Sequence, residues 1–168
     1  GIDDEDVVSM LKGPRGTKVN VRILRKGYPE LLSFNITRDK IPIYSVDVAY
    51  MINDVTGYIR INNFAESTFQ DFMNGMRELT GKGMKKLILD LRGNSGGVMD
   101  ASIQIANEFL KKDQLIVYTK GRTEARNEAR ATGNGEFETG DLVILIDEMS
   151  ASASEILAGA IQDNDRGT

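Results

Sequence analysis

The sequence predicts an α/β fold built on a mostly parallel sheet, and three observations support this prediction. Short apolar segments alternate with segments of helical period along residues 59–162, which is the order of strands and crossover helices in parallel sheets. Two of these apolar segments, 87–91 and 142–146, are hydrophobic at almost every position, as in strands that are covered on both faces. A turn rich in glycine or serine follows each of the two.

Composition excludes several classes of function. The chain has 168 residues with 21 Lys and Arg against 25 Asp and Glu, and its net charge of −4 argues against nucleic-acid binding through a positive surface. The absence of histidine and cysteine excludes Ser-His-Asp and Cys-His catalysis and the usual zinc sites. No apolar segment approaches the roughly 18 residues of a membrane span. We therefore expect no metal or other cofactor and no nucleic-acid partner, and nothing indicates membrane association.

Residues 1–39 predict one helix and two strands. The apolar residues of 3–12 recur at helical spacing behind an acidic first turn, and a Gly-Pro pair ends the helix. Apolar and polar residues then alternate in 17–23 and again in 32–36, which predicts two strands joined by a turn. These elements bury too little for an independent core, so we expect them to be part of a domain that begins outside this sequence.

Residues 40–110 predict a connector and then two strand–helix units. Residues 40–54, with Pro42, predict a connector or an edge strand. A strand at 59–61 precedes Ser67-Thr68-Phe69-Gln70, a capping-box pattern that predicts the start of a helix. The strand 87–91 and a second helix follow. The apolar residues expected on the inner faces of the helices are Phe69, Phe72, Met73, Met76 and Leu79 in the first and Ile103, Ala106, Phe109 and Leu110 in the second.

The last third of the chain predicts two strands, at 115–119 and 142–146, and a helix at 153–162. Between the strands, residues 121–140 are polar, charged and almost free of apolar residues, which predicts a long surface loop. A loop of this length is either a lid or binding edge, or a solvated connector.

The turn after the first apolar strand is Asp90-Leu91-Arg92-Gly93-Asn94-Ser95-Gly96-Gly97. Ligands of open α/β sheets bind at the carboxyl ends of the strands. Three glycines in five residues let the backbone approach a ligand closely and direct N–H groups at an anion or a developing oxyanion. The same residues also suit a tight strand-to-helix turn without a function, and they match no phosphate-loop pattern.

The turn after the second apolar strand leads into Ser150-Ala151-Ser152-Ala153-Ser154-Glu155-Ile156. A serine hydroxyl at a helix N-terminus lies among free N–H groups at the positive end of the helix dipole, which favours an alkoxide and an oxyanion. However, Ser152-Ala153-Ser154-Glu155 also fits a capping box that needs no catalytic role. Taken alone, this turn is explained by either alternative.

Together the two turns favour acyl transfer, because a serine at one junction and glycine amides at another could flank one carbonyl group. Without histidine, the base would be a desolvated lysine whose pKa is lowered. The candidate lysines all lie in polar segments, where burial is not expected: Lys82, Lys85, Lys86, Lys111, Lys112 and Lys120.

Both turns, with Ala158-Gly159-Ala160-Ile161-Gln162-Asp163 after the second, resemble the motifs of the C-terminal processing peptidases. These are tail-specific, PDZ-containing serine proteases of peptidase family S41 with a Ser/Lys dyad. The resemblance covers nearly the whole chain, because Gly13-Pro14-Arg15-Gly16-Thr17 and the following strands resemble the end of a PDZ domain. It implies the C-terminal part of a PDZ domain at 1–39 and, at 40–168, a catalytic domain with a crotonase/ClpP-like layered α/β fold.

Position by position, the resemblance implies that Ser152 is the nucleophile of a serine endopeptidase that cleaves proteins near their C-termini. The amide of Ala153 and that of Gly96 or Gly97 would form the oxyanion hole.

Glu155 and Asp163 match two acidic positions of the family. Eleven residues of helix place Asp163 about 16 Å from Ser152, so we expect a structural role for Asp163. Glu155, one turn from Ser152, could cap the helix or orient the site.

In the family the general-base lysine lies on the strand after this helix, and no lysine follows Ser152 in this sequence. We therefore expect that this chain lacks its base and is inactive as a peptidase on its own. The resemblance also implies polypeptide substrates with apolar C-terminal tails and a place in the bacterial cell envelope or periplasm, whereas the oligomeric state stays open.

Two alternatives remain. A non-catalytic PDZ-type peptide-binding module would use the serines only as a helix cap and would add a peptide strand to a sheet edge. A crotonase-type acyl-thioester enzyme would also use backbone amides, but it explains neither the serine turn nor residues 1–39.

Overall fold

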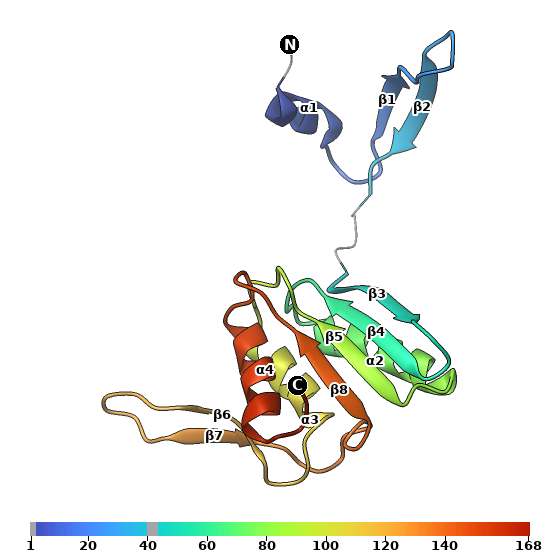
Figure 1. The fold of residues 1–168 in the computed structure, drawn as a ribbon. Helices are drawn as coiled ribbons and strands as arrows, with labels where there is room; N and C mark the ends of the chain where they lie inside the picture. Colours follow the sequence, from blue (N-terminus) through green and yellow to red (C-terminus); the bar gives the residue numbers. More distant parts are fainter. Residues whose placement is uncertain (1–2, 40–43) are drawn as a thin grey trace. The chain divides into compact units, whose positions relative to one another are not determined.

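The computed structural model describes residues 3–39 and 44–168, and the chain divides into two compact units between residues 43 and 44 (Figure 1). The first unit contains α1 (Asp4–Leu11), β1 (Lys18–Ile23) and β2 (Leu32–Thr37), and the two strands pair in antiparallel fashion. The Arg38 guanidinium donates hydrogen bonds to the Leu11 and Met10 carbonyls at the end of α1. No residue of 3–39 is buried. The predicted helix and two strands are confirmed.

The second unit is built on a four-stranded sheet of order β3-β4-β5-β8 (Figure 1). Its strands β4, β5 and β8 are parallel, and β3 joins β4 in antiparallel fashion as an edge strand. The predicted mostly parallel sheet is therefore confirmed. The segment expected to be a connector or an edge strand contains an edge strand in its described part, and residues 40–43 lie outside the described residues. The elements of this unit are β3 (Val46–Met51), β4 (Thr56–Ile61), α2 (Thr68–Gly81), β5 (Lys86–Asp90), α3 (Met99–Asn107), β6 (Leu115–Thr119), β7 (Asn127–Arg130), β8 (Asp141–Leu145) and α4 (Ala153–Asp163).

The core of the second unit lies between the sheet and its helices. α2 packs against β3 and β4, α3 packs against α2 and α4, and both α3 and α4 contact β6. The apolar residues predicted for the inner faces of the two middle helices are all buried or partly buried there, although Phe109 and Leu110 lie just past the end of α3. The buried residues that β4, β5 and β8 give to this core are Ile59, Ile61, Leu87, Leu89 and Leu142, and Leu91 joins them directly after β5. None of the helices in the described ranges is long and apolar enough to cross a membrane.

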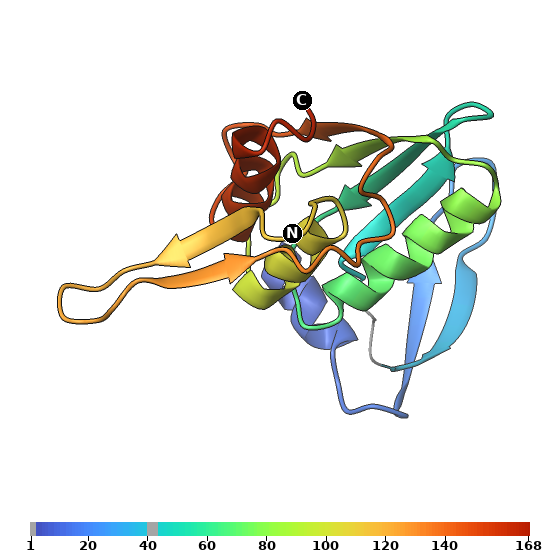
Figure 2. The ribbon, with the colours of Figure 1, turned by 90° about the horizontal axis from the view of Figure 1, so that it is seen from below.

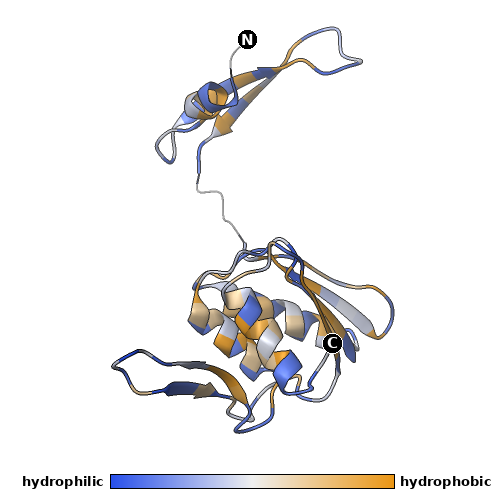
Figure 3. Ribbon diagram, turned by 60° about the vertical axis from the view of Figure 1, so that its left-hand side comes forward, coloured by the Kyte–Doolittle hydropathy of each residue, from blue (hydrophilic) through white to orange (hydrophobic). Residues whose placement is uncertain are grey.

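The prediction of a loop throughout 121–140 is wrong, because this segment contains β7. β7 pairs with β6 in antiparallel fashion, and the two form a separate sheet that projects from the unit (Figure 2). Three of its four residues, Asn-Glu-Ala-Arg, are exposed and only Ala129 is partly covered, so the strand lacks the apolar alternation that sequence analysis relies on. Figure 3 shows this contrast as a hydrophobic β6 beside a hydrophilic β7.

The capping box predicted at Ser67 is also wrong. Ser67 already has helical backbone angles, φ −81° and ψ −12°, so its hydroxyl turns away from the free N–H groups and bonds the Asp71 carboxylate at 3.2 Å. Thr68 Oγ1 instead accepts a hydrogen bond from the Ala65 N–H at 2.7 Å. A residue one position later therefore provides the hydroxyl that organises the entry to α2.

Residue Thr168 pairs with β8. Its N–H donates to the Leu142 carbonyl at 3.2 Å, and its carbonyl accepts from the Ile144 N–H at 2.7 Å, which is the pattern of a parallel pair. The edge of β8 that faces β5 uses other residues, among them Asp141 and Leu145. At Thr168 the chain thus runs in the same direction as β8, along the edge that β5 leaves open.

Candidate active site

The two turns singled out in the sequence lie side by side. β5 and β8 are parallel neighbours with Asp90 opposite Leu145, so their carboxyl ends meet at one edge of the sheet. The Leu91 N–H donates to the Leu145 carbonyl at 2.8 Å and continues the pairing beyond β5. The glycine turn (residues 91–97) and the serine turn (residues 146–152) therefore begin at adjacent strand ends, where ligands of such sheets bind.

Two of the three serines attach the serine turn and α4 to the glycine turn. Ser150 Oγ donates to the Leu91 carbonyl at 2.8 Å, and Ser154 Oγ donates to the Asn94 carbonyl at 2.9 Å. Ser152, between them, is exposed, and among the described residues its hydroxyl makes no hydrogen bond to the glycine turn. The glycine turn therefore uses the two outer hydroxyls and leaves the exposed middle one unused.

Asp147 makes a further connection between the two turns. Its carboxylate accepts hydrogen bonds from the Gly93 N–H at 2.9 Å, the Met149 N–H at 3.1 Å and the Ser150 hydroxyl at 3.2 Å. These hydrogen bonds hold the pKa of Asp147 below its usual value, and the bond from the Gly93 N–H has the largest effect. Sequence analysis assigned Asp147 no role, because its main partner is 54 positions away and nothing local indicates the contact.

Ser152 precedes α4 in a strained backbone conformation. Its φ of 55° and ψ of −114° are angles that residues other than glycine rarely adopt. The Glu155 carboxylate accepts the Ser152 N–H at 2.7 Å, and the Ser152 side chain faces the Glu155 N–H. The capping box that one of the two sequence alternatives predicts is therefore present. An N-cap residue ordinarily has extended backbone angles, so the cap by itself does not account for the strain.

The glycine turn passes in close contact with Ser152. A methyl group on Gly96 would lie 2.7 Å from Ser152 Cβ and 3.0 Å from the Ala153 nitrogen, and one on Gly97 would overlap the Phe64 carbonyl oxygen. Both glycines have positive φ, +98° and +137°. Only glycine gives the close approach and the backbone angles that this arrangement requires.

The amides near Ser152 differ in whether they already have an acceptor. The Gly96 N–H donates to Asn94 Oδ1 at 2.9 Å and is therefore occupied. Within residues 3–39 and 44–168, nothing accepts a hydrogen bond from the N–H of Gly97 or of Ala153. Two donors near the contact between the turns are thus unpaired: the amide of Ala153, directly after Ser152, and that of Gly97, directly after the Gly96 that meets Ser152.

A buried carboxylate holds the start of the glycine turn. Asp90, 1% exposed, accepts hydrogen bonds from the Tyr58 hydroxyl and from Arg92 Nη2, both at 2.6 Å. Arg92, and to a smaller extent Tyr58, lower the pKa of Asp90 to about 2 despite its burial. Sequence analysis missed Tyr58, which only the pairing of β4 with β5 brings near Asp90.

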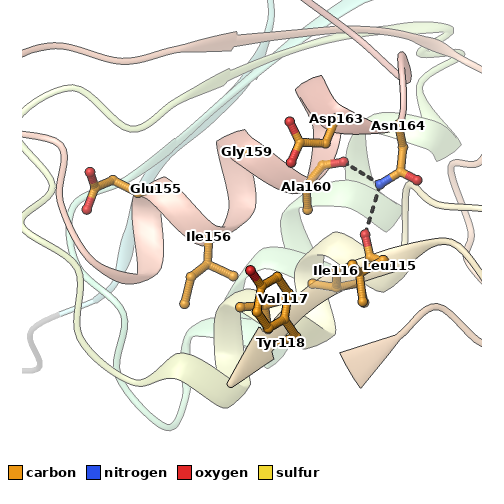
Figure 4. A pocket seen from close by; sticks show the side chains of 10 residues that line it. All are labelled: Leu115, Ile116, Val117, Tyr118, Glu155, Ile156, Gly159, Ala160, Asp163 and Asn164. Carbon is orange, nitrogen blue, oxygen red and sulfur yellow. Dashed lines mark hydrogen bonds between the residues drawn. The ribbon is translucent and has the colours of Figure 1, made fainter. Parts of the chain in front are cut away.

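The two acidic residues of α4 lie at opposite ends of the helix, along a pocket of about 360 Å³ between α4 and β6 (Figure 4). Glu155 is in the first turn and contacts the Ser152 amide. Asp163 is the last residue of the helix, so the structure does not bring it to the Ser152 hydroxyl.

The candidate lysines are not brought to Ser152. Lys86 begins β5, at the opposite end from Asp90, and pairs with Asp141 at 3.0 Å, whereas Lys82 pairs with Glu78 at 2.6 Å. In the part of the chain that the structure describes, no lysine makes a hydrogen bond or an ion pair with Ser152. The same part contains no group of three or more acidic residues placed to hold a metal ion.

Comparisons with known proteins give the family. The profile of peptidase family S41 matches residues 55–168. A carboxyl-terminal-processing protease from Synechocystis is 37% identical over 170 residues, which cover 98% of this chain and 39% of that protein. The carboxy-terminal processing protease CtpA of Bacillus subtilis is 33% identical over 167 residues, covering 98% of this chain and 34% of its own length.

The structural comparison agrees. The photosystem II D1 C-terminal processing protease matches with a TM-score of 0.67 at 28% sequence identity, covering 97% of this chain and 45% of its own. The chain thus spans less than half the length of these relatives. Because the profile covers more than half of the chain and the relatives match almost all of it, the protein belongs to peptidase family S41, the family of the carboxyl-terminal processing serine proteases.

Proposed function

We propose that Ser152 is the nucleophile of a serine endopeptidase that cleaves proteins near their carboxyl termini. One observation carries this proposal: the exposed Ser152, at a strained helix N-cap, lies against Gly96 of the glycine turn, and the amides that follow these two residues, of Ala153 and Gly97, are unpaired. Two N–H groups beside a nucleophile are what an oxyanion hole needs. Since the Gly96 amide is occupied by Asn94, we assign the hole to Gly97 and Ala153.

In the proposed reaction, Ser152 Oγ attacks the carbonyl carbon of the scissile peptide bond while its proton passes to a general base. The oxyanion that forms accepts hydrogen bonds from the two amides. The C–N bond then breaks, and the base gives the proton to the leaving amine, so that an ester on Ser152 remains. Water, deprotonated by the same base, attacks this ester, and the acid product leaves as Ser152 regains a proton. This sequence needs no metal and no nucleotide.

The base in this proposal is a lysine, in a Ser/Lys dyad, from a segment that follows Thr168 in the full protein. A lysine whose pKa is lowered by burial can serve as a base where histidine is absent. The pairing of Thr168 supports this placement, because a strand that continues from it runs along β8 toward the edge where Ser152 lies. Residues 1–168 alone then have no base and no peptidase activity.

Glu155 and Asp163 have supporting roles in this proposal. Glu155 accepts the Ser152 N–H and so fixes the backbone of the nucleophile. Asp163, at the far end of α4, is structural.

We also propose that residues 1–39 are the C-terminal part of a PDZ domain and that 40–168 belong to a catalytic domain of crotonase/ClpP-like architecture. The helix and hairpin of the first unit, and the layered sheet and helices of the second, support this assignment. Substrates would be polypeptides with apolar C-terminal tails, and the site of action would be the bacterial cell envelope.

The test compares residues 1–168 with the full protein on an unfolded peptide that has an apolar tail. We expect cleavage near the C-terminus by the full protein, none by residues 1–168, and none by the full-length Ser152→Ala variant. Turnover by residues 1–168, or by the Ser152→Ala variant, would contradict the assignment. Folding of the variant is verified by circular dichroism, and Ser67→Ala, at an exposed serine before α2, serves as the control.

A further inference from the structure

Asn94 is the buried residue at which the parts of the candidate site meet. It is 0% exposed, and both polar atoms of its side chain are used. Nδ2 donates to the Ile61 carbonyl at the end of β4 at 2.9 Å, and Oδ1 accepts from the Gly96 N–H at 2.9 Å. The side chain therefore ties the glycine turn to the neighbouring strand of the sheet.

The backbone carbonyl of Asn94 holds the other half of the site. It accepts hydrogen bonds from the Ala151 N–H at 3.1 Å and from Ser154 Oγ at 2.9 Å. These two donors stand on either side of Ser152 and Ala153 in the sequence. One residue thus contacts the sheet, the glycine turn and the serine turn.

The direction of the Gly97 amide follows from the hydrogen bonds on both sides of Gly96. The carbonyl of Gly96 accepts from the Phe64 N–H at 2.9 Å. In a trans peptide unit the C=O and the following N–H point in opposite directions, so the Gly97 N–H points away from Phe64. Because Asn94 Oδ1 fixes the Gly96 N–H on the other side of the same residue, both peptide units around Gly96 are held.

We propose that Asn94 is a positioning residue for the oxyanion hole, an inference that rests on the proposed function. Its side chain occupies the Gly96 amide and thereby selects the Gly97 amide as the donor. Its backbone carbonyl sets the position of the serine turn relative to that donor. Asn94 touches no substrate and acts through Gly97, so its effect falls on the transition state and not on substrate binding.

The experiment uses the full protein with Asn94→Ala. Loss of one oxyanion-hole donor lowers kcat by about 10²–10³-fold. Displacing a donor that is still present should lower kcat by less. We expect kcat to fall at least about 10-fold, with KM changed less than about 2-fold. A peptide boronic acid, which forms a tetrahedral adduct with a serine hydroxyl, should bind more weakly by the factor that kcat/KM loses.

Asn164→Ala is the matched control. Asn164 Nδ2 also donates to two carbonyls, those of Leu115 and Ala160, at 2.9 and 2.8 Å, but it lies at the far end of α4 (Figure 4). We expect this variant to lose stability without a change in kcat. An equal loss of kcat in both variants would overturn the inference, because the effect would then follow stability. An Asn94→Ala variant with unchanged kcat, or with only its KM raised, would also overturn the inference.

Asn94→Asp provides a second measurement should the alanine variant not fold. A neutral aspartic acid can accept from the Gly96 N–H and donate to the Ile61 carbonyl, whereas the carboxylate can only accept. The ratio of kcat between this variant and the parent should therefore rise as pH falls. A ratio independent of pH would overturn the inference. If Ser152→Ala retains activity, the proposed function fails; if it is inactive and the Asn94 variants keep kcat, only the positioning role fails.

Discussion

Replacing Gly96 with alanine tests how tightly the glycine turn and the serine turn meet. A φ of +98° costs an alanine about 1–2 kcal/mol. Its methyl group would also lie 2.6 Å from the Ala151 carbonyl oxygen and 2.7 Å from Ser152 Cβ, distances at which backbone has to move, and overpacking of this kind costs about 1–3 kcal/mol. We therefore expect Gly96→Ala to lower the free energy of unfolding by about 3–4 kcal/mol.

Gly93→Ala is the matched control for this measurement. Gly93 also has a positive φ, +73°, but a methyl group there would meet nothing within 4 Å. This variant should lose only the backbone part, about 1 kcal/mol. Urea denaturation of both variants of the 168-residue chain, followed by far-UV circular dichroism, gives the difference, which we expect to be about 2–3 kcal/mol. Equal losses for the two variants would refute the close contact between the glycine turn and Ser152.

Three further outcomes are expected from the same geometry. Ser152→Gly should abolish activity in the full protein but raise the free energy of unfolding by about 1 kcal/mol. Glycine relieves the strain at φ 55° and is itself an acceptable N-cap residue. A lower free energy of unfolding in urea would contradict this prediction. Asp90 has a pKa of about 2 in the folded protein against a usual 3.8, so it contributes about 2 kcal/mol above its usual pKa, and this contribution is lost as pH falls through about 2. Urea unfolding across this pH range should show this loss in the parent and not in Asp90→Asn. If the free energy of unfolding depends on pH equally in the two proteins, the lowered pKa of Asp90 is disproved. Gly159→Ala should raise stability by about 0.8 kcal/mol, since a methyl group in that turn of α4 meets nothing within 4 Å; a lower thermal midpoint would show that the added methyl group is not accommodated.

The elements that carry the site could be predicted from sequence because local patterns determine them. The apolar segments 87–91 and 142–146 became the parallel neighbours β5 and β8 with the expected turns after them. The expectation that both faces of these strands are covered is wrong for β8, because Val143 is exposed and Ile146, also exposed, lies just past its end. The resemblance placed the nucleophile at the middle serine, a role that stays a prediction. The structure adds a physical reason for this choice, since the hydroxyls of Ser150 and Ser154 are both used by the glycine turn.

What sequence analysis missed depends on contacts between distant residues. Asn94 has an indication in the sequence, since an asparagine often bonds the backbone two residues later, as it does here with Gly96. Its bond to Ile61, and that of Asp147 to Gly93, exist only once the strands are ordered in the sheet. β7 escaped notice because its polar residues pair through the backbone and bury almost nothing.

The hydrogen bonds between the glycine turn and the serine turn determine when the candidate site forms during folding. Gly93 and Asp147 are 54 positions apart, and Leu91 and Ser150 are 59, so the pieces around Ser152 assemble only after long-range strand pairing, a late and slow event in folding. A nascent or heat-denatured chain then carries an ordinary, unreactive serine. In the proposed function, a reactive Ser152 would therefore appear only together with the native state.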